Sequence, residues 1–362
     1  MQKKVVALAV AGILAVPMAA QAGVEVYGQA RLSVGFIGND AAAPADDSSL
    51  SVTSHASRLG FKGAEDLGND LKAVYQFERG IDFDNQTSSA TDSGSDTVSV
   101  SNITARNSYV GLAGGFGTVI VGIHDTPYKI ATSRLDVFSD TYGDYNAVIS
   151  SAHDVRLDNV LAYMSPDMGG FSLVVAYVSD IANDDLPDSD STVDKAAVSI
   201  AGMYSNGPLY ASLAFQSISD YTGTAGEDAD AMKLGLGYKL SQTDLGFVYE
   251  NTKVSKIAPA IEPDQNAIYF SVSHPITTDT NVKLAIGQLD ESSNGAKNGG
   301  DFVAIGVSRN MTKNAELYAL YSQMANDTNG TNGLTAGSGP AAGADKTASA
   351  LAVGINLKFS SL

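Results

Sequence analysis

The feature that most constrains this chain is a repeated alternation of apolar and polar residues over segments of strand length. Between positions 24 and 36 the even positions are apolar or small, and the odd positions include Glu25, Gln29, Arg31 and Ser33. Successive side chains of a β-strand point to opposite faces, so the pattern predicts a strand with one apolar and one polar face. The same alternation recurs at 71–78, 232–240, 244–250 and 350–359.

Two kinds of connection separate the expected strands. Seven are tight turns, and eight are longer, more variable and mostly acidic or rich in Ser and Gly. Fifteen connections join sixteen strands, and a strict alternation of short and long ones places all tight turns at one end of the sheet. The tight turns are expected at 65–69, 114–117, 167–170, 206–208, 241–243, 277–280 and 310–313.

An even number of antiparallel strands of about ten residues, apolar on one face, is typical of a transmembrane β-barrel. Closure pairs every strand edge, as a bilayer requires. A soluble β-sandwich or β-helix would need bulky apolar side chains inside, whereas the second face here carries Gly, Ser, Lys, Glu and Arg. We therefore predict an all-β protein, an antiparallel 16-stranded transmembrane β-barrel around an aqueous channel.

The amino terminus reads as an export signal. Lys3 and Lys4 precede an apolar run from Val5 to Val16, and Ala20 and Ala22 frame a small-residue cleavage site before Gly23. This arrangement is typical of a secretory signal peptide, and the apolar run is too short for a membrane anchor. We expect a signal peptide over 1–22 and a barrel domain over 23–362.

Charge and composition exclude other classes. The net charge is −18, and removing the two lysines of the signal takes it to −20. A general nucleic-acid binder needs a basic face, so that class is excluded. No segment has eighteen consecutive apolar residues, so no transmembrane helix is expected, and the absence of cysteine rules out disulfides.

The connection from Asp125 to Val155 differs from the others. It is long for a structureless loop, yet it is rich in tyrosine and branched apolar residues, which argue against disorder. Asp136, Asp140 and Asp144 recur at a spacing of four, which also suits one face of a short helix. We expect a folded, functional loop.

The segment Ser57 to Gly68, SRLGFKGAEDLG, resembles a hairpin of the Gram-negative general porins. The segments 106–112 and 115–119 resemble the next hairpin of that family, and 163–166 with 170–171 the one after it. The resemblance implies a homotrimeric outer-membrane barrel whose third long loop, about 125–155, folds inward and narrows the pore. It also implies contact with outer-membrane lipid and lipopolysaccharide, the barrel-insertion machinery, and small hydrophilic solutes and ions.

Two positions depart from this family. Ile123 stands where the family commonly has an arginine directly before the inward loop. The family tends to end in phenylalanine, whereas here Phe359 is followed by Ser360, Ser361 and Leu362. We interpret Phe359 as the C-terminal insertion signal in a shifted position.

The alternation of inward and outward positions places five cations on the lumen face, because charges on the lipid face would be costly. These five cations are Arg31, Arg58, Lys72, Arg106 and Arg156. A basic wall opposite acidic loop residues would set a field across a narrow, water-filled gap; the alternative is that they are ordinary solvated lumen residues. Because the loop carries three aspartates and one expected arginine is missing, we expect modest cation selectivity. The candidate pore-lining residues are Arg31, Arg58, Lys72, Arg106, Arg156, Asp136, Asp140 and Asp144.

Enzymatic features are weak, and we expect no catalytic residues, cofactor or metal. His124 precedes Asp125 and His153 precedes Asp154, but adjacent strand residues point to opposite faces. Calcium among the loop aspartates is an alternative to plain solvation, although no ligand-loop spacing supports it. The leading hypothesis is a channel for passive diffusion of small hydrophilic solutes. The alternatives are a substrate-specific porin, a surface adhesin or receptor, and a barrel hydrolase.

Overall fold

The computed structural model describes residues 23–39, 49–84, 103–179, 181, 195–221, 226–255, 264–293, 295–334 and 342–361. The expected signal peptide, 1–22, lies outside the described residues, as do the acidic residues from Asp184 to Asp190 in the connection before residue 195. Within the described ranges, no helix has the length and apolar character needed to cross a membrane.

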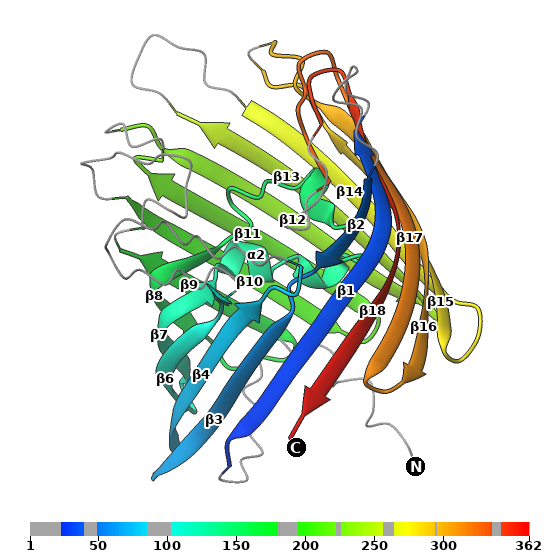
Figure 1. The fold of residues 1–362 in the computed structure, drawn as a ribbon. Coiled ribbons are helices and arrows are strands. Elements are labelled where there is room, and N and C mark those ends of the chain that lie inside the picture. The colour runs from blue at the N-terminus through cyan, green and yellow to red at the C-terminus, as the bar shows by residue number, and fades with distance from the viewer. Residues whose placement is uncertain are drawn as a thin grey trace, which may run out of the picture.

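The described chain is mainly antiparallel β-structure (Figure 1). Three short helices, α2 (Pro127–Ile130), η2 (Ser133–Leu135) and η3 (Tyr145–Ala147), lie between β7 and β8. The strands are β1 (Glu25–Asn39), β2 (Ser49–Ser54), β3 (Arg58–Gly68), β4 (Leu71–Ile81), β5 (Ile103–Ala105), β6 (Ser108–Gly114), β7 (Gly117–Asp125), β8 (Arg156–Met164), β9 (Phe171–Val178), β10 (Ala196–Asn206), β11 (Leu209–Ser219), β12 (Ala229–Leu240), β13 (Thr243–Val254), β14 (Asp264–Pro275), β15 (Thr280–Leu289), β16 (Gly300–Thr312), β17 (Ala315–Asn326) and β18 (Thr347–Ser360).

The eighteen segments make sixteen strands, because two strands are interrupted. Segments β2 and β3 both pair with β1, and segments β5 and β6 both pair with β4, so each pair is one broken strand. Strand β18 pairs with β1 from Tyr27 opposite Ser360 to Asn39 opposite Ala348, which closes the barrel. The predicted 16-stranded barrel and the predicted pairing of its first and last strands are both confirmed.

All seven expected tight turns join neighbouring strands, from the turn between β3 and β4 to the turn between β16 and β17. The eight longer connections lie at the opposite ends of the strands. The glycines of two tight turns, Gly68 and Gly207, have positive φ angles of 82° and 56°. Glycine adopts these left-handed conformations without steric cost, which explains its use where the chain reverses sharply.

The two faces of the sheet differ as the alternation predicted. On β1 and β18, Phe36 and Val353 expose 62% and 61% of their surface outward, whereas Ser33 and Asn356 of the same strands are buried inside. An outer face of exposed apolar side chains matches the hydrocarbon of a bilayer, and a polar inner face matches a water-filled interior. Closure satisfies the backbone of both edge strands without water.

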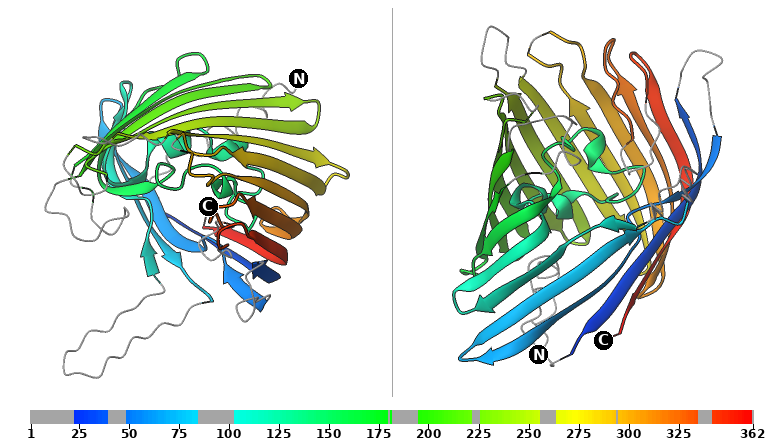
Figure 2. Two further views of the ribbon diagram at one scale, coloured as in Figure 1. Left: turned by 90° about the horizontal axis from the view of Figure 1, so that it is seen from above. Right: turned by 60° about the vertical axis from the view of Figure 1, so that its left-hand side comes forward.

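The third long loop, 125–155, folds into the barrel, as the view from above shows (Figure 2). Its apolar side chains pack against the inner wall and form the main buried cluster of the molecule. Leu135, Phe138 and Tyr145 of the loop meet Val248 and Tyr269 of the wall in this cluster. The core of the protein is therefore the layer between the loop and the wall.

Candidate pore constriction

The two ends of the loop are clamped together where it leaves and re-enters the barrel. Asp125, the last residue of β7, is paired with Arg156, the first residue of β8, at 2.9 Å. The Asn107 side chain donates to the Asp125 carboxylate and accepts from the Arg156 guanidinium at 2.6 Å. Thr126 then caps α2 by accepting from the Lys129 amide. The ion pair between Asp125 and Arg156 therefore holds the two ends of the loop together.

Farther into the loop, a buried lysine of the wall is inserted between its outgoing and returning limbs. Lys233 of β12 has no exposed surface, and its Nζ lies 2.5 Å from Asp154 Oδ1. The ammonium also lies 4.2 Å from the Tyr128 ring centre and 5.7 Å from that of Tyr145. Burial alone would raise the pKa of Asp154, but Lys233 and Lys129 outweigh it and hold the pKa below its usual range.

Buried polar groups of the wall fix the rest of the loop. Glu250 of β13 accepts from Tyr128 Oη at 2.8 Å and from the Ser150 amide at 2.6 Å, so it binds both limbs. Ser271 of β14 and Ser322 of β17 donate to the carbonyls of Leu135 and Tyr142. The loop's contacts thus run along the inner wall toward β17, and its shape is set by side chains that face the lumen.

Two of the three candidate loop aspartates are bonded within the tip of the loop. Asp136 accepts from the Phe138 and Tyr145 amides and from Tyr269 Oη, and Asp144 accepts from the Asp140 and Asn146 amides. Both residues are buried. Burial raises the pKa of Asp136 to about 6, and burial beside Asp136 raises that of Asp144 well above its usual range. These carboxylates bind backbone amides at the tip of the loop, and Asp136 also borders a recess beneath that tip.

Asp140 is the loop aspartate that reaches the charged wall, with a third of its side chain exposed. It has a left-handed φ of 54°, and its carboxylate lies 3.3 Å from Arg31 and 3.8 Å from Arg58. Arg31 also donates to the carbonyls of Ser139 and Asp140. Asp140 therefore joins the tip of the loop to two of the arginines that parity placed on the lumen face.

Beyond Arg58, a row of alternating charges continues away from the loop through Glu78 of β4. Glu78 lies 3.8 Å from Arg58 and 2.6 Å from Arg106, and it accepts from Tyr27 Oη at 2.9 Å. Charges thus alternate from Arg31 through Asp140, Arg58 and Glu78 to Arg106. Glu78 was not among the sequence-predicted site residues, although its polar position in the alternation of β4 was a usable signal.

The two strand interruptions position this row. Arg58 directly follows the break at 55–57, where Ala56 has a φ of 49°, and Arg106 lies within the break at 106–107. At the first break the His55 amide donates to the Arg31 carbonyl, and the His55 ring bonds the Ser33 hydroxyl. Such irregularities redirect side chains relative to a regular ladder. Arg58 and Arg106, from the strands on either side of β4, thus flank Glu78, and Arg31 of β1 extends the row.

The remaining candidates lie elsewhere. Arg156 is at the base of the loop, and Lys72 is the second residue of β4, about 20 Å along the strand from Glu78 at 3.3 Å per residue. Ile123 lies in β7 opposite Ser108. The expected cation preference rested on three loop aspartates and on Ile123 in place of an arginine; two of the aspartates are buried, which weakens that basis.

The two His–Asp sequence pairs form no acid–base unit. His124 Nδ1 bonds the backbone carbonyl of Asp125, and the buried His153 contacts Gln216 and the ring of Tyr128. Burial, together with Lys233, lowers the pKa of His153 to about 4, so the ring is neutral at pH 7. Among the described residues, no three His, Cys, Asp or Glu side chains are grouped as a metal site would require.

A closed barrel with an apolar outside, a polar inside and an inward loop opposite a row of arginines defines a membrane pore protein. Residues 6–329 match the Gram-negative porin family. The chain is 28% identical over 347 residues to outer membrane porin protein 32 of Delftia acidovorans, with 93% of each chain covered. It is 35% identical over 182 residues, 49% of each chain, to a major outer membrane protein P.IB of Neisseria meningitidis serogroup B.

Solved structures agree with this assignment. An anion-selective porin from Comamonas acidovorans has a TM-score of 0.77 at 25% identity, with 93% of this chain and 99% of that chain covered. Salmonella typhi OmpF, at 17% identity and a TM-score of 0.69, shares the fold. The chain belongs to the Gram-negative porin family and is an outer-membrane β-barrel. The Delftia acidovorans relative is named as a porin, and porins are channels and not enzymes.

Proposed function

We propose that this porin is a passive diffusion channel for small hydrophilic solutes and ions, and that its constriction favours anions. The observation that carries the proposal is the imbalance of charge in the row beside the loop. Arg31 and Arg58 meet the loop carboxylate Asp140, and Arg106 continues the row beyond the almost buried Glu78, so three cations stand against two carboxylates. A net positive rim attracts anions and penalises cations at the narrowest point.

The acidic character of the whole chain opposes this preference at longer range. Its net charge is −18, and acidic residues are dense in the long connections, which raises cation concentration near the mouth. Salt screens such distant charges first, because the Debye length is about 3 Å at 1 M and about 10 Å at 0.1 M. Anion preference should therefore be clearest at high salt and should weaken as salt is lowered.

Zero-current potentials of the purified protein in planar bilayers test this proposal. A potassium chloride gradient at high mean salt should give the anion-selective sign, and the same ratio at low mean salt should give a smaller value. A cation-selective sign at high salt would contradict the charge argument. Conductance that saturates steeply with one salt would favour the rival function, a substrate-specific porin.

A homotrimer is part of the same proposal. A structure of OmpT from Vibrio cholerae is described as a trimer form, and its fold is similar to that of this chain at a TM-score of 0.67. Small outward residues support a protein contact at the barrel closure: Ala30 lies opposite Leu357, and Ala319 lies between Val307 and Val353. Light scattering of the native sample should give three times the monomer mass, and a monomer mass would contradict this part.

A further inference from the structure

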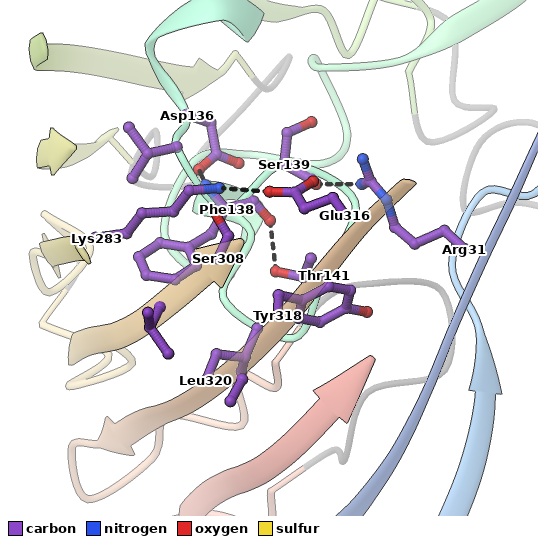
Figure 3. A pocket seen from close by; sticks show the side chains of 13 residues that line it. Arg31, Asp136, Phe138, Ser139, Thr141, Lys283, Ser308, Glu316, Tyr318 and Leu320 are labelled. Atoms are coloured by element: carbon purple, nitrogen blue, oxygen red, sulfur yellow. Dashed lines mark hydrogen bonds and ion pairs between the residues drawn. The ribbon is translucent and has the colours of Figure 1, made fainter. Parts of the chain in front are cut away.

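A polar recess lies beneath the tip of the constriction loop, beside the row of arginines. It has a volume of about 210 Å³ and is enclosed by the loop tip from Asp136 to Thr141 and by strands β15, β16 and β17. Arg31 closes its remaining side (Figure 3). Lys283 and Glu316 stand near the tight-turn ends of β15 and β17, so the recess lies on the tight-turn side of the constriction.

Both signs of charge enter this recess. Lys283 and Glu316 expose 24% and 27% of their side chains, and their closest atoms are 3.8 Å apart. This distance exceeds that of a hydrogen bond, so each group has hydrogen-bonding capacity that the other does not use. Arg31 enters from the side opposite Lys283 (Figure 3). A solute in the recess therefore meets the donors Lys283 and Arg31 together with the Glu316 carboxylate.

We propose that the recess is a binding site for small zwitterions, such as α-amino acids, on their way through the channel. The inference rests on the proposed diffusion function and deepens it. An anion would be attracted by Lys283 and Arg31 but repelled by Glu316 and Asp136, and a cation would meet the reverse. A zwitterion places its carboxylate at Lys283 and its ammonium at Glu316, so each group gains a charge-assisted hydrogen bond. The recess has room for several water molecules, which matches a compact amino acid.

Four solutes of nearly equal size separate charge from shape. Alanine carries both charges, lactate carries the anion, alaninamide carries the cation, and lactamide carries neither. Tracer flux of each into proteoliposomes should be measured against its concentration. Alanine flux should saturate, whereas lactamide flux should rise linearly. Lactamide flux also shows that the pore is open, so its absence would refute the diffusion function, separately from the zwitterion site.

Variants of the pair make the test specific. Lys283→Gln and Glu316→Gln should each raise the half-saturating alanine concentration about tenfold, the loss of one charge-assisted bond from a partly exposed group. The exchanged pair Lys283→Glu with Glu316→Lys should restore saturation, because a zwitterion can bind in the reverse orientation. The matched control is Asp244→Asn, which breaks the exposed Lys239–Asp244 pair at a tight turn and should change nothing.

Each possible result decides the proposal. Linear alanine flux through the wild-type channel would overturn it, and so would unchanged saturation in both single variants. Saturation of the flux of all four solutes would also overturn it, since it would show a site that does not distinguish solutes by their charge. Saturation by alanine that is lost in each single variant and regained in the exchanged pair would establish it.

Discussion

At the scale of single residues, Asp140 governs the charge of the constriction. Its carboxylate is the one exposed acid that the loop, within the described residues, brings to Arg31 and Arg58. Spacing alone made Asp136, Asp140 and Asp144 equivalent in the sequence. Their environments differ because local backbone amides capture two of the carboxylates, and such short-range bonding is invisible to a spacing of four.

The variant Asp140→Asn removes one negative charge and keeps the size of the side chain. It should increase anion preference, because Arg31 then loses its carboxylate partner and Arg58 keeps only Glu78. Zero-current potentials should shift further in the anion direction than in the wild type. Asp244→Asn, in the exposed Lys239–Asp244 pair at a tight turn, is the matched comparison, and the zero-current potential of that variant should stay within error of the wild type. A shift toward cations in Asp140→Asn would contradict the arrangement.

At the scale of elements, the loop keeps its place through buried groups of the wall. The alternation of β12 and β13 correctly put Lys233 and Glu250 on the inner face, and the tyrosines and branched apolar residues of 125–155 correctly predicted a folded loop. The sequence did not say which inner-face charges would be buried under the loop and which would line the pore. That division depends on where the loop lies against the wall, and long-range packing decides it.

The variant Lys233→Met tests whether the wall holds the loop. It leaves Asp154 buried with Lys129 as its remaining cation, and removing one partner of a buried ion pair costs about 3–5 kcal/mol. The loop should loosen, so single-channel currents should become noisier and the channel should close at lower voltage. Lys239→Met, on an exposed lysine of the same strand, is the control and should behave as the wild type. Quiet, voltage-stable currents from Lys233→Met would refute this role.

At the scale of the whole molecule, barrel closure follows from the sequence more directly than the pore does. Apolar and polar residues alternate through the first and last strands, and a register shift of one residue would turn every side chain to the opposite face. The observed register instead keeps like faces together, with Val34 opposite Val353 and Arg31 opposite Asn356. The broken strands were not predicted, because a two- or three-residue interruption leaves the alternation on either side readable.

The carboxyl end of β18 carries the last prediction. Phe359 faces outward with half of its surface exposed, and it lies opposite Gly28 on β1, whose missing side chain leaves room for the ring. Phe359→Asp places a charge on the lipid-facing surface and removes the aromatic side chain that we interpret as the insertion signal, so the amount of barrel inserted in the outer membrane should fall severely. Deleting residues 360–362 removes the two hydrogen bonds between Ser361 and Val26 but leaves Phe359 in place. That deletion should therefore insert and lose only some thermal stability. Quantifying heat-modifiable protein in isolated outer membranes measures both effects, and wild-type levels of the aspartate variant would show that Phe359 is not the insertion signal.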